Sequence, residues 1–138
     1  MKIQVTIDCA DPHRLVEFWG EALEYQIEDH TALIEQLLAD GRLPEAAVVS
    51  VRDGKGFAEL AACVHPTGEQ PRLLFQRVPE GKTVKNRVHL DLQYGPEDAP
   101  AQVERMLGLG ATLAWVSDDK GGRCTTLRDP EGNEFCVT

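Results

Sequence analysis

Apolar and polar residues alternate along two separate segments of the chain. In residues 3–9 the odd positions are apolar and the even positions are polar, and residues 88–94 repeat the pattern with apolar even positions. A period of two residues predicts a β-strand with one face on a core and one polar face. The polar faces would carry Gln4, Thr6, Asp8, His89, Asp91 and Gln93.

Helical spacing follows each of these strands. Asp11 and Pro12 have the residue types of an N-cap and a first helical turn. A helix is predicted after them, with apolar residues at Leu15, Phe18, Trp19, Ala22 and Leu23. Residues 31–39 predict a short helix, and residues 96–109 predict a longer one that ends at Gly110, with Val103, Met106 and Leu107 facing inward.

Further strands complete each half of the chain. They are predicted at residues 25–28, 46–52, 58–65 and 72–78, and then at 112–117, 124–128 and 133–138, with a turn over 52–56 and a loop at Gly121 and Gly122. Residues 129–137 read as a Pro-Gly turn entering a strand, and residues 65–78 are an earlier form of the same pattern. The chain therefore consists of two copies of one plan, over about residues 1–80 and 86–138.

Composition limits the classes of function. The 138 residues are enough for one domain with one sizeable core, and the net charge of −9 argues against a nucleic-acid or anionic-membrane surface. No apolar run approaches the ~20 residues of a membrane span, and no signal peptide fits before Asp8. The four cysteines lack metal-ribbon or disulfide-framework spacing, which indicates reduced thiols and a cytoplasmic protein.

Several segments resemble the glyoxalase/bleomycin-resistance/extradiol-dioxygenase superfamily, which has the vicinal oxygen chelate fold. Residues 7–12, 18–19, 74–80, 85–91 and 129–137 are similar to its glyoxalase-like domain proteins, and only residues 29–45 fit loosely. The resemblance implies a single α+β domain over residues 1–138. In it, two βαβββ modules form a cup-shaped, eight-stranded mixed sheet with the helices outside.

The resemblance also implies where a metal would bind. In metal-dependent members the ligands come from the first and fourth strands of each module, two His or Gln and two Glu. The matching positions here are Gln4, Gln76, His89 and Cys136. Cys136 replaces a carboxylate, and two neutral amides supply none of the charge that offsets the dehydration of an ion. No metal is therefore expected, although zinc or nickel at these four residues stays possible.

Further polar residues are candidates for proton transfer and for ligand binding. Asp91 and Glu134, together with His89, are the candidates for proton transfer. Each has a simpler structural reading: His89 as a hydrogen-bonding residue, Asp91 as a surface partner of Arg87, and Cys136 as a small buried residue. The candidate binding surface of the cup consists of Gln4, Thr6, Asp8, Gln76, Gln93 and Cys136.

Three functions follow from these residues. The first is a lyase or isomerase that acts on a small oxygenated molecule in the cup. The second is a metal-free small-molecule-binding protein similar to bleomycin-resistance members, and the acidic composition would favour a cationic ligand. The third is a dimeric module without chemistry of its own. In each case a twofold homodimer is expected, because family members close their open sheets by pairing.

Overall fold

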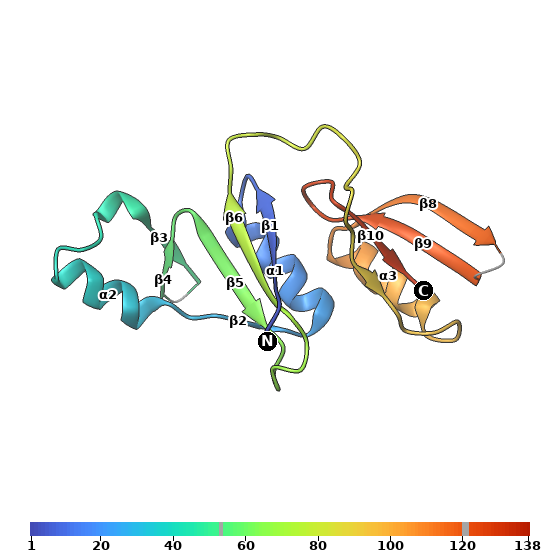
Figure 1. The fold of residues 1–138 in the computed structure, drawn as a ribbon, viewed down its shortest axis with the longest axis horizontal. Coiled ribbons are helices and arrows are strands. Elements are labelled where there is room, and N and C mark those ends of the chain that lie inside the picture. Colours follow the sequence, from blue (N-terminus) through green and yellow to red (C-terminus); the bar gives the residue numbers. More distant parts are fainter. Residues whose placement is uncertain (53, 120–121) are drawn as a thin grey trace. The chain divides into compact units, whose positions relative to one another are not determined.

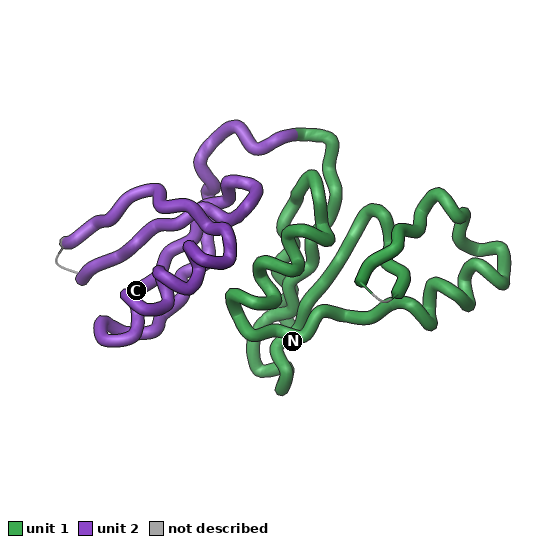
Figure 2. Tube along the Cα trace, turned by 180° about the vertical axis from the view of Figure 1, so that it is seen from behind, with its two compact units in different colours: residues 1–80 green, residues 81–138 purple. Residues whose placement is uncertain are grey.

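The chain divides into two compact units, residues 1–80 and 81–138 (Figure 2). Each unit has its own four-stranded sheet (Figure 1). The computed structural model describes residues 1–52, 54–119 and 122–138. Asp53 of the predicted turn and Gly121 of the predicted loop lie outside these ranges.

Unit 1 is a βαβββ module with an insertion. Its four-stranded sheet has the order β1-β6-β5-β2, in which β1 and β6 are parallel and the other neighbours are antiparallel. A helix, a 3₁₀ turn and a hairpin are inserted between β2 and β5. The elements are β1 Gln4–Cys9, α1 Pro12–Leu23, β2 Gln26–Ile27, α2 Thr31–Ala39, η1 Glu45–Ala47, β3 Val48–Val51, β4 Gly54–Phe57, β5 Leu60–Val64 and β6 Arg72–Arg77.

Helix α1 begins and packs as its sequence predicts. The Asp11 carboxylate accepts hydrogen bonds from the backbone N–H groups of His13 and Arg14, both at 3.1 Å, and so satisfies two free donors of the first turn. Its apolar stripe is buried in the core of unit 1, where Phe18 and Trp19 pack edge to face at 5.4 Å.

The insertion contains a hairpin of which the sequence predicted only the first strand, β3. Residues 54–57 form β4, which pairs with β3, whereas the sequence predicted a turn there. Turn-type residues occupy this strand because its neighbours come very close. A side chain at Gly54 would overlap Thr31, and one at Gly56 would lie 2.5 Å from His13 Cε1.

Unit 2 repeats the module without an insertion. Its sheet has the order β7-β10-β9-β8, again with the first and last strands parallel and the rest antiparallel. The turn before β10 is fixed by the Asp129 carboxylate, which accepts hydrogen bonds from the backbone N–H groups of Glu131 and Asn133 at 2.9 Å. The elements are β7 Asp91–Leu92, α3 Ala99–Leu109, β8 Thr112–Asp119, β9 Gly122–Arg128 and β10 Glu134–Val137.

Some predicted apolar contacts are wrong. Ile3 is 62% exposed and Val88 is 82% exposed, because each precedes the paired part of its strand. Leu107 of α3 is also exposed, whereas Met106 beside it is fully buried. The predicted alternation holds only within the hydrogen-bonded strands.

The predicted fold class is confirmed: the chain is α+β with two βαβββ modules. The eight strands of the modules lie in two sheets of four, and a cup formed by both sheets stays a prediction. None of the helices in the described residues is long and apolar enough to cross a membrane.

Replacing Gly56 with alanine tests the packing of the hairpin. The new Cβ would press on His13 and Val51, so we expect Gly56→Ala to lower the free energy of unfolding by about 1–3 kcal/mol in urea denaturation. Gly81→Ala is the control, because nothing lies within 4 Å of its Cβ position. Equal stability of the two variants would contradict the close approach.

Candidate functional site

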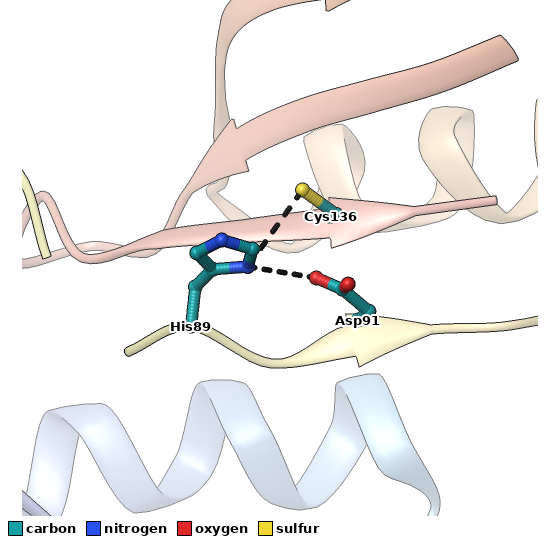
Figure 3. Close-up of side chains that lie close together, drawn as sticks. All are labelled: His89, Asp91 and Cys136. Atoms are coloured by element: carbon teal, nitrogen blue, oxygen red, sulfur yellow. Dashed lines mark hydrogen bonds and ion pairs between the residues drawn. The ribbon is translucent and has the colours of Figure 1, made fainter. Parts of the chain in front are cut away.

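Three side chains with different chemistry meet on the sheet of unit 2 (Figure 3). His89 Nδ1 lies 2.7 Å from Asp91 Oδ1 and 4.0 Å from Cys136 Sγ. One ligand-type atom from each residue lies within 4.8 Å of the other two. An imidazole, a carboxylate and a thiol thus share one small region.

The pairing of β7 with β10 brings this cluster together. Asp91 and Cys136 are direct partners across the two parallel strands, and His89 precedes Asp91 by two residues. Backbone hydrogen bonds extend the pairing beyond β7: the Cys136 N–H donates to the Leu90 carbonyl oxygen at 2.9 Å. His89 and Asp91 therefore point to the same face as Cys136.

The Cys136 thiol is protonated at neutral pH. Burial raises its pKa to about 11; the hydrogen bond with Thr126 acts in the opposite direction, and Cys124 and Asp91 also raise the pKa. The Thr126 hydroxyl lies 3.5 Å from the sulfur. Without a metal, Cys136 is a poor nucleophile, because the thiolate is the reactive form.

The His89 imidazole keeps one nitrogen free. Nδ1 faces the Asp91 carboxylate, so in the neutral ring the proton lies on Nδ1 and the lone pair on Nε2. Within residues 1–52, 54–119 and 122–138, Nε2 has no hydrogen-bond partner. The exposed fractions of the His89 and Asp91 side chains are 35% and 51%, so a small molecule can reach both.

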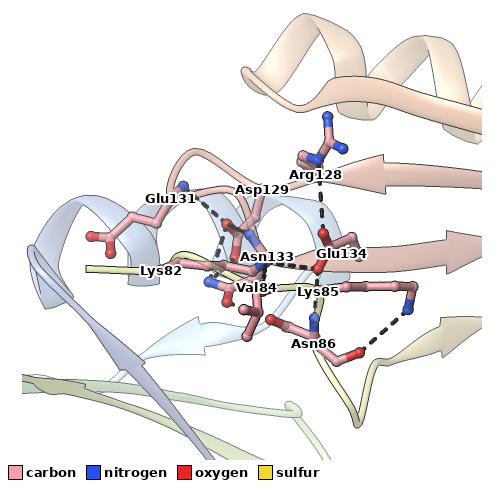
Figure 4. Close-up of polar contacts among 9 residues, drawn as sticks. All are labelled: Lys82, Val84, Lys85, Asn86, Arg128, Asp129, Glu131, Asn133 and Glu134. Atoms are coloured by element: carbon pink, nitrogen blue, oxygen red, sulfur yellow. Dashed lines mark hydrogen bonds and ion pairs between the residues drawn. The ribbon is translucent and has the colours of Figure 1, made fainter. Parts of the chain in front are cut away.

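Glu134 does not join this cluster, although the sequence placed it among the proton-transfer residues. Its carboxylate is 6% exposed, accepts a hydrogen bond from the Asn86 backbone N–H at 3.0 Å and lies 2.9 Å from Lys82 Nζ (Figure 4). Burial opposes its ionisation, but the bonds from Asn86 and Lys82 prevail and lower its pKa to about 2. Glu134 anchors the segment that leads to His89.

The registers of the two parallel strand pairs correct the matching of the two halves. Gln76 lies opposite Asp8 as Cys136 lies opposite Asp91, so Thr6, not Gln4, corresponds to His89. Gln4 lies opposite Arg72, four positions from the Asp8–Gln76 pair, or about 13 Å along the strands. The structure therefore does not bring the two glutamines together as ligands of one ion.

Unit 1 contains a cavity, lined by charged and apolar residues, that the sequence did not indicate. It has a volume of about 550 Å³ and lies between the start of α1 and the β3–β4 hairpin. His30 Nε2 lies 3.1 Å from the Glu28 carboxylate, which also receives two hydrogen bonds from Arg72. The bonds from Arg72 outweigh burial and lower the pKa of Glu28. Glu28 and His30 lie in the connection between β2 and α2, whereas Arg72 lies on β6, so the complete group depends on a contact between distant parts of the sequence.

The remaining candidates are polar surface residues or line another cavity. Thr6 and Asp8 are exposed on β1, and the Gln4 amide bridges Thr6 and Arg72. Gln93 lines a cavity of about 700 Å³ beside the first half of α3. Among these residues, only Asp8 and Gln76 lie directly opposite each other on paired strands.

The donor set of the cluster suits a borderline metal ion. Imidazole nitrogen, thiolate sulfur and carboxylate oxygen are all zinc ligands, and three protein ligands leave one position for a ligand oxygen. A metal there is compatible with the described residues. In this set, Asp91 is a ligand in place of the predicted glutamines Gln4 and Gln76. Binding would displace the thiol proton.

A sequence model of the glyoxalase-like domain family matches residues 4–138, nearly the whole chain. The chain belongs to this family. Among curated proteins, none is similar enough in sequence to count as a match.

Solved structures share the fold of this glyoxalase-like protein at low sequence identity. A glyoxalase/bleomycin resistance protein/dioxygenase family enzyme from Burkholderia phytofirmans PsJN has a TM-score of 0.64 and 16% identity, over 97% of this chain and 94% of that chain. A variant of the fosfomycin resistance protein FosX from Listeria monocytogenes has a TM-score of 0.61 and 12% identity, over 97% and 85%. That structure contains Mn(II) and 1S,2S-dihydroxypropylphosphonic acid. These similarities show the fold.

The low pKa of Glu134 predicts how the stability of this glyoxalase-like protein depends on pH. A carboxyl group whose pKa is lowered from 4.5 to about 2 stabilises the folded state above pH 4.5 and loses that effect as the pH falls toward 2. We expect Glu134→Gln to cost about 1–3 kcal/mol at pH 7 and to weaken the acid dependence of thermal unfolding. Glu97→Gln, at an exposed carboxylate, is the control. Equal pH profiles for the two variants would contradict this role.

Proposed function

We propose that this glyoxalase-like protein is a lyase or isomerase that acts on a small oxygenated molecule through the His89–Asp91 pair. The observation that supports it is the 2.7 Å contact between His89 Nδ1 and Asp91, which leaves Nε2 free beside an accessible surface. This arrangement is that of a general base held by a carboxylate.

The proposed reaction begins with the transfer of one carbon-bound proton. His89 Nε2 takes the proton from a carbon next to a carbonyl group, and the electron pair of the C–H bond passes into an enolate. The negative charge of Asp91 stabilises the imidazolium that forms. In an isomerase that acts on a hydroxycarbonyl compound, the hydroxyl proton of the enediolate moves to the former carbonyl oxygen, and the imidazolium returns its proton to the former carbonyl carbon. In a lyase, the electron pair of the enolate expels the leaving group, which takes the proton from the imidazolium. The protonated Cys136 thiol can donate a weak hydrogen bond to the substrate.

The polar residues that the sequence predicted on unit 1 remain part of this proposal. Thr6, Asp8 and Gln76 of unit 1 are polar and occupy the strand positions that match His89, Asp91 and Cys136 of unit 2. We propose that Thr6, Asp8 and Gln76 form a polar ligand-binding surface of unit 1. The FosX relative, which contains a small phosphonic acid and Mn(II), supports a small oxygenated ligand.

The first test follows the tautomer of His89 and its reactivity. In two-dimensional ¹⁵N NMR we expect the Nδ1–H tautomer in the wild type and its loss in Asp91→Asn. We also expect the wild type to exchange the carbon-bound protons of dihydroxyacetone and related hydroxycarbonyl compounds with D₂O. His89→Gln should slow this exchange at least about 100-fold, the usual contribution of a general base.

His13 is the internal control for the tautomer. Its Nε2 lies 2.8 Å from the Phe57 carbonyl oxygen, so it should keep the Nε2–H tautomer in Asp91→Asn. If no compound of the panel exchanges faster with the wild type than with His89→Gln, the enzyme proposal is wrong. The metal-free binding protein would then be the better interpretation.

A metal centre is the second candidate, and the convergence of three donor types within 4.8 Å favours it. His89, Asp91 and Cys136 would hold a zinc-class ion. When bound, such an ion polarises a substrate carbonyl or lowers the pKa of a bound water. The residues would then orient the substrate, and Asp91 would balance the charge of the ion.

Elemental analysis separates the two candidates. From the sequence we expect less than stoichiometric divalent metal in protein purified without added metal. Near one zinc per chain, lost in His89→Ala and Cys136→Ala but kept in Cys63→Ala, would make the metal centre the leading candidate. Cys63 is the matched control, because it is fully buried in unit 1. Retention of zinc by the His89 and Cys136 variants would exclude this site.

The homodimer and the cytoplasmic location stay predictions from the sequence. Strand β8 lies at the edge of its sheet and exposes Leu113 and Val116, which supports pairing with a second copy.

A further inference from the structure

The cluster is one end of a row of side chains that crosses the whole sheet of unit 2. Asp91 lies opposite Cys136, Cys136 lies opposite Thr126, and Thr126 lies opposite Trp115. Direct partners on neighbouring strands point to the same face, and the contact between Thr126 and Cys136 agrees with this. Three strand spacings place Trp115 about 14 Å from Asp91.

The two ends of the row are exposed and the middle is not. Cys136 and Thr126 are 9% and 3% exposed, whereas Trp115 is 40% exposed. The Asp91 side chain at the other end is half exposed. An exposed indole with its ring on the same face as the cluster is a surface on which a flat group can stack.

A lysine accompanies this indole. Lys85 Nζ lies 5.8 Å from the centre of the Trp115 ring, and it donates a hydrogen bond to the carbonyl oxygen of Asn86 at 3.3 Å. In the parts of the chain that the structure describes, no carboxylate lies within ion-pair distance of Lys85. Its charge therefore remains available to an anion beside the ring.

Lys85 is the positive side chain of this region that has no carboxylate partner among the described residues. Lys82 and Arg128 both face the Glu134 carboxylate, at 2.9 Å and 3.9 Å, and Asp91 is paired with His89. A carboxylate on the ligand would therefore meet the ammonium group of Lys85 beside the indole ring.

We propose that Trp115 and Lys85 form a subsite for a flat, ring-containing group that bears a carboxylate. This inference rests on the proposed function, because it gives the substrate class of the same site. The ring stacks on Trp115, the carboxylate pairs with Lys85, and the opposite end of the molecule reaches the His89–Asp91 pair. Trp115 and Lys85 position the substrate and take no part in proton transfer.

Benzoate titration of ¹⁵N-labelled protein tests the subsite. The chain has two tryptophans, so two indole N–H signals are expected, and Trp115→Phe assigns them. Benzoate should shift the Trp115 signal, while Trp19, which is 2% exposed in unit 1, serves as the internal control. Acetate lacks the ring and benzyltrimethylammonium lacks the anion, so each should bind at least about fivefold more weakly than benzoate.

Lys85→Met keeps the aliphatic stem and removes the charge, so it should weaken benzoate about fivefold and leave benzyltrimethylammonium unchanged or tighter. Equal binding of benzoate and acetate, or no effect of Lys85→Met, would overturn the subsite. A Trp115 signal that responds to protein concentration but not to benzoate would assign this residue to an interface between copies, which also overturns it.

His89→Gln separates this inference from the proposed function. It should leave benzoate binding within about twofold, because His89 lies at the other end of the row. Benzoate binding together with an absence of proton exchange in the wild type would therefore refute the enzyme proposal and keep the subsite. Proton exchange by the wild type without benzoate binding would refute the subsite and keep the enzyme proposal.

Discussion

The parallel pairing of the first and last strands of each module is the constraint on which the rest of the structure depends. In unit 2 this pairing sets Asp91 against Cys136, and in unit 1 the same pairing sets Asp8 against Gln76. Parallel strands need a long crossover connection, and here α1 or α3 and two further strands supply it. A change in this register by one residue would put the His89 and Asp91 side chains on the face opposite to that of Cys136.

A second constraint fixes the approach to the site. His89 precedes the two residues of β7, so the sheet alone holds it weakly. The segment before it is tied down by the buried Glu134 carboxylate, which binds Lys82 and the Asn86 backbone. A buried carboxylate is stable only when its hydrogen bonds are satisfied. The contacts that satisfy Glu134 therefore also hold the segment that positions His89. Glu134 thus contributes to the site through structure.

Cys136 links the chemistry of the site to its energetics. Because it is buried and protonated, it behaves as a small, unreactive residue in metal-free protein. This is the structural alternative that the sequence offered for Cys136. A bound zinc-class ion would favour the thiolate and change this character. The same side chain therefore separates the two candidate functions, and its position in the middle of the Asp91–Trp115 row makes either one compatible with a ligand that spans the row.

The sequence by itself determined the elements whose signals are local. The Asp11–Pro12 start of α1, helix α2 at residues 31–39, the turn at Asp129 and the two-module plan were all predicted, because caps, turn residues and periodicity act over a few neighbours. Strand β3 was predicted within residues 46–52, but its partner β4 was missed. Its glycines Gly54 and Gly56 are required by close contacts with Thr31 and His13, which are distant in the sequence. Only the tertiary structure decided the register. The register brings Asp91 next to His89 and Glu134 next to Lys82. It also separates Gln4 from Gln76 and places Trp115 in the same row as Cys136. Contacts across strands depend on alignments that no local pattern specifies.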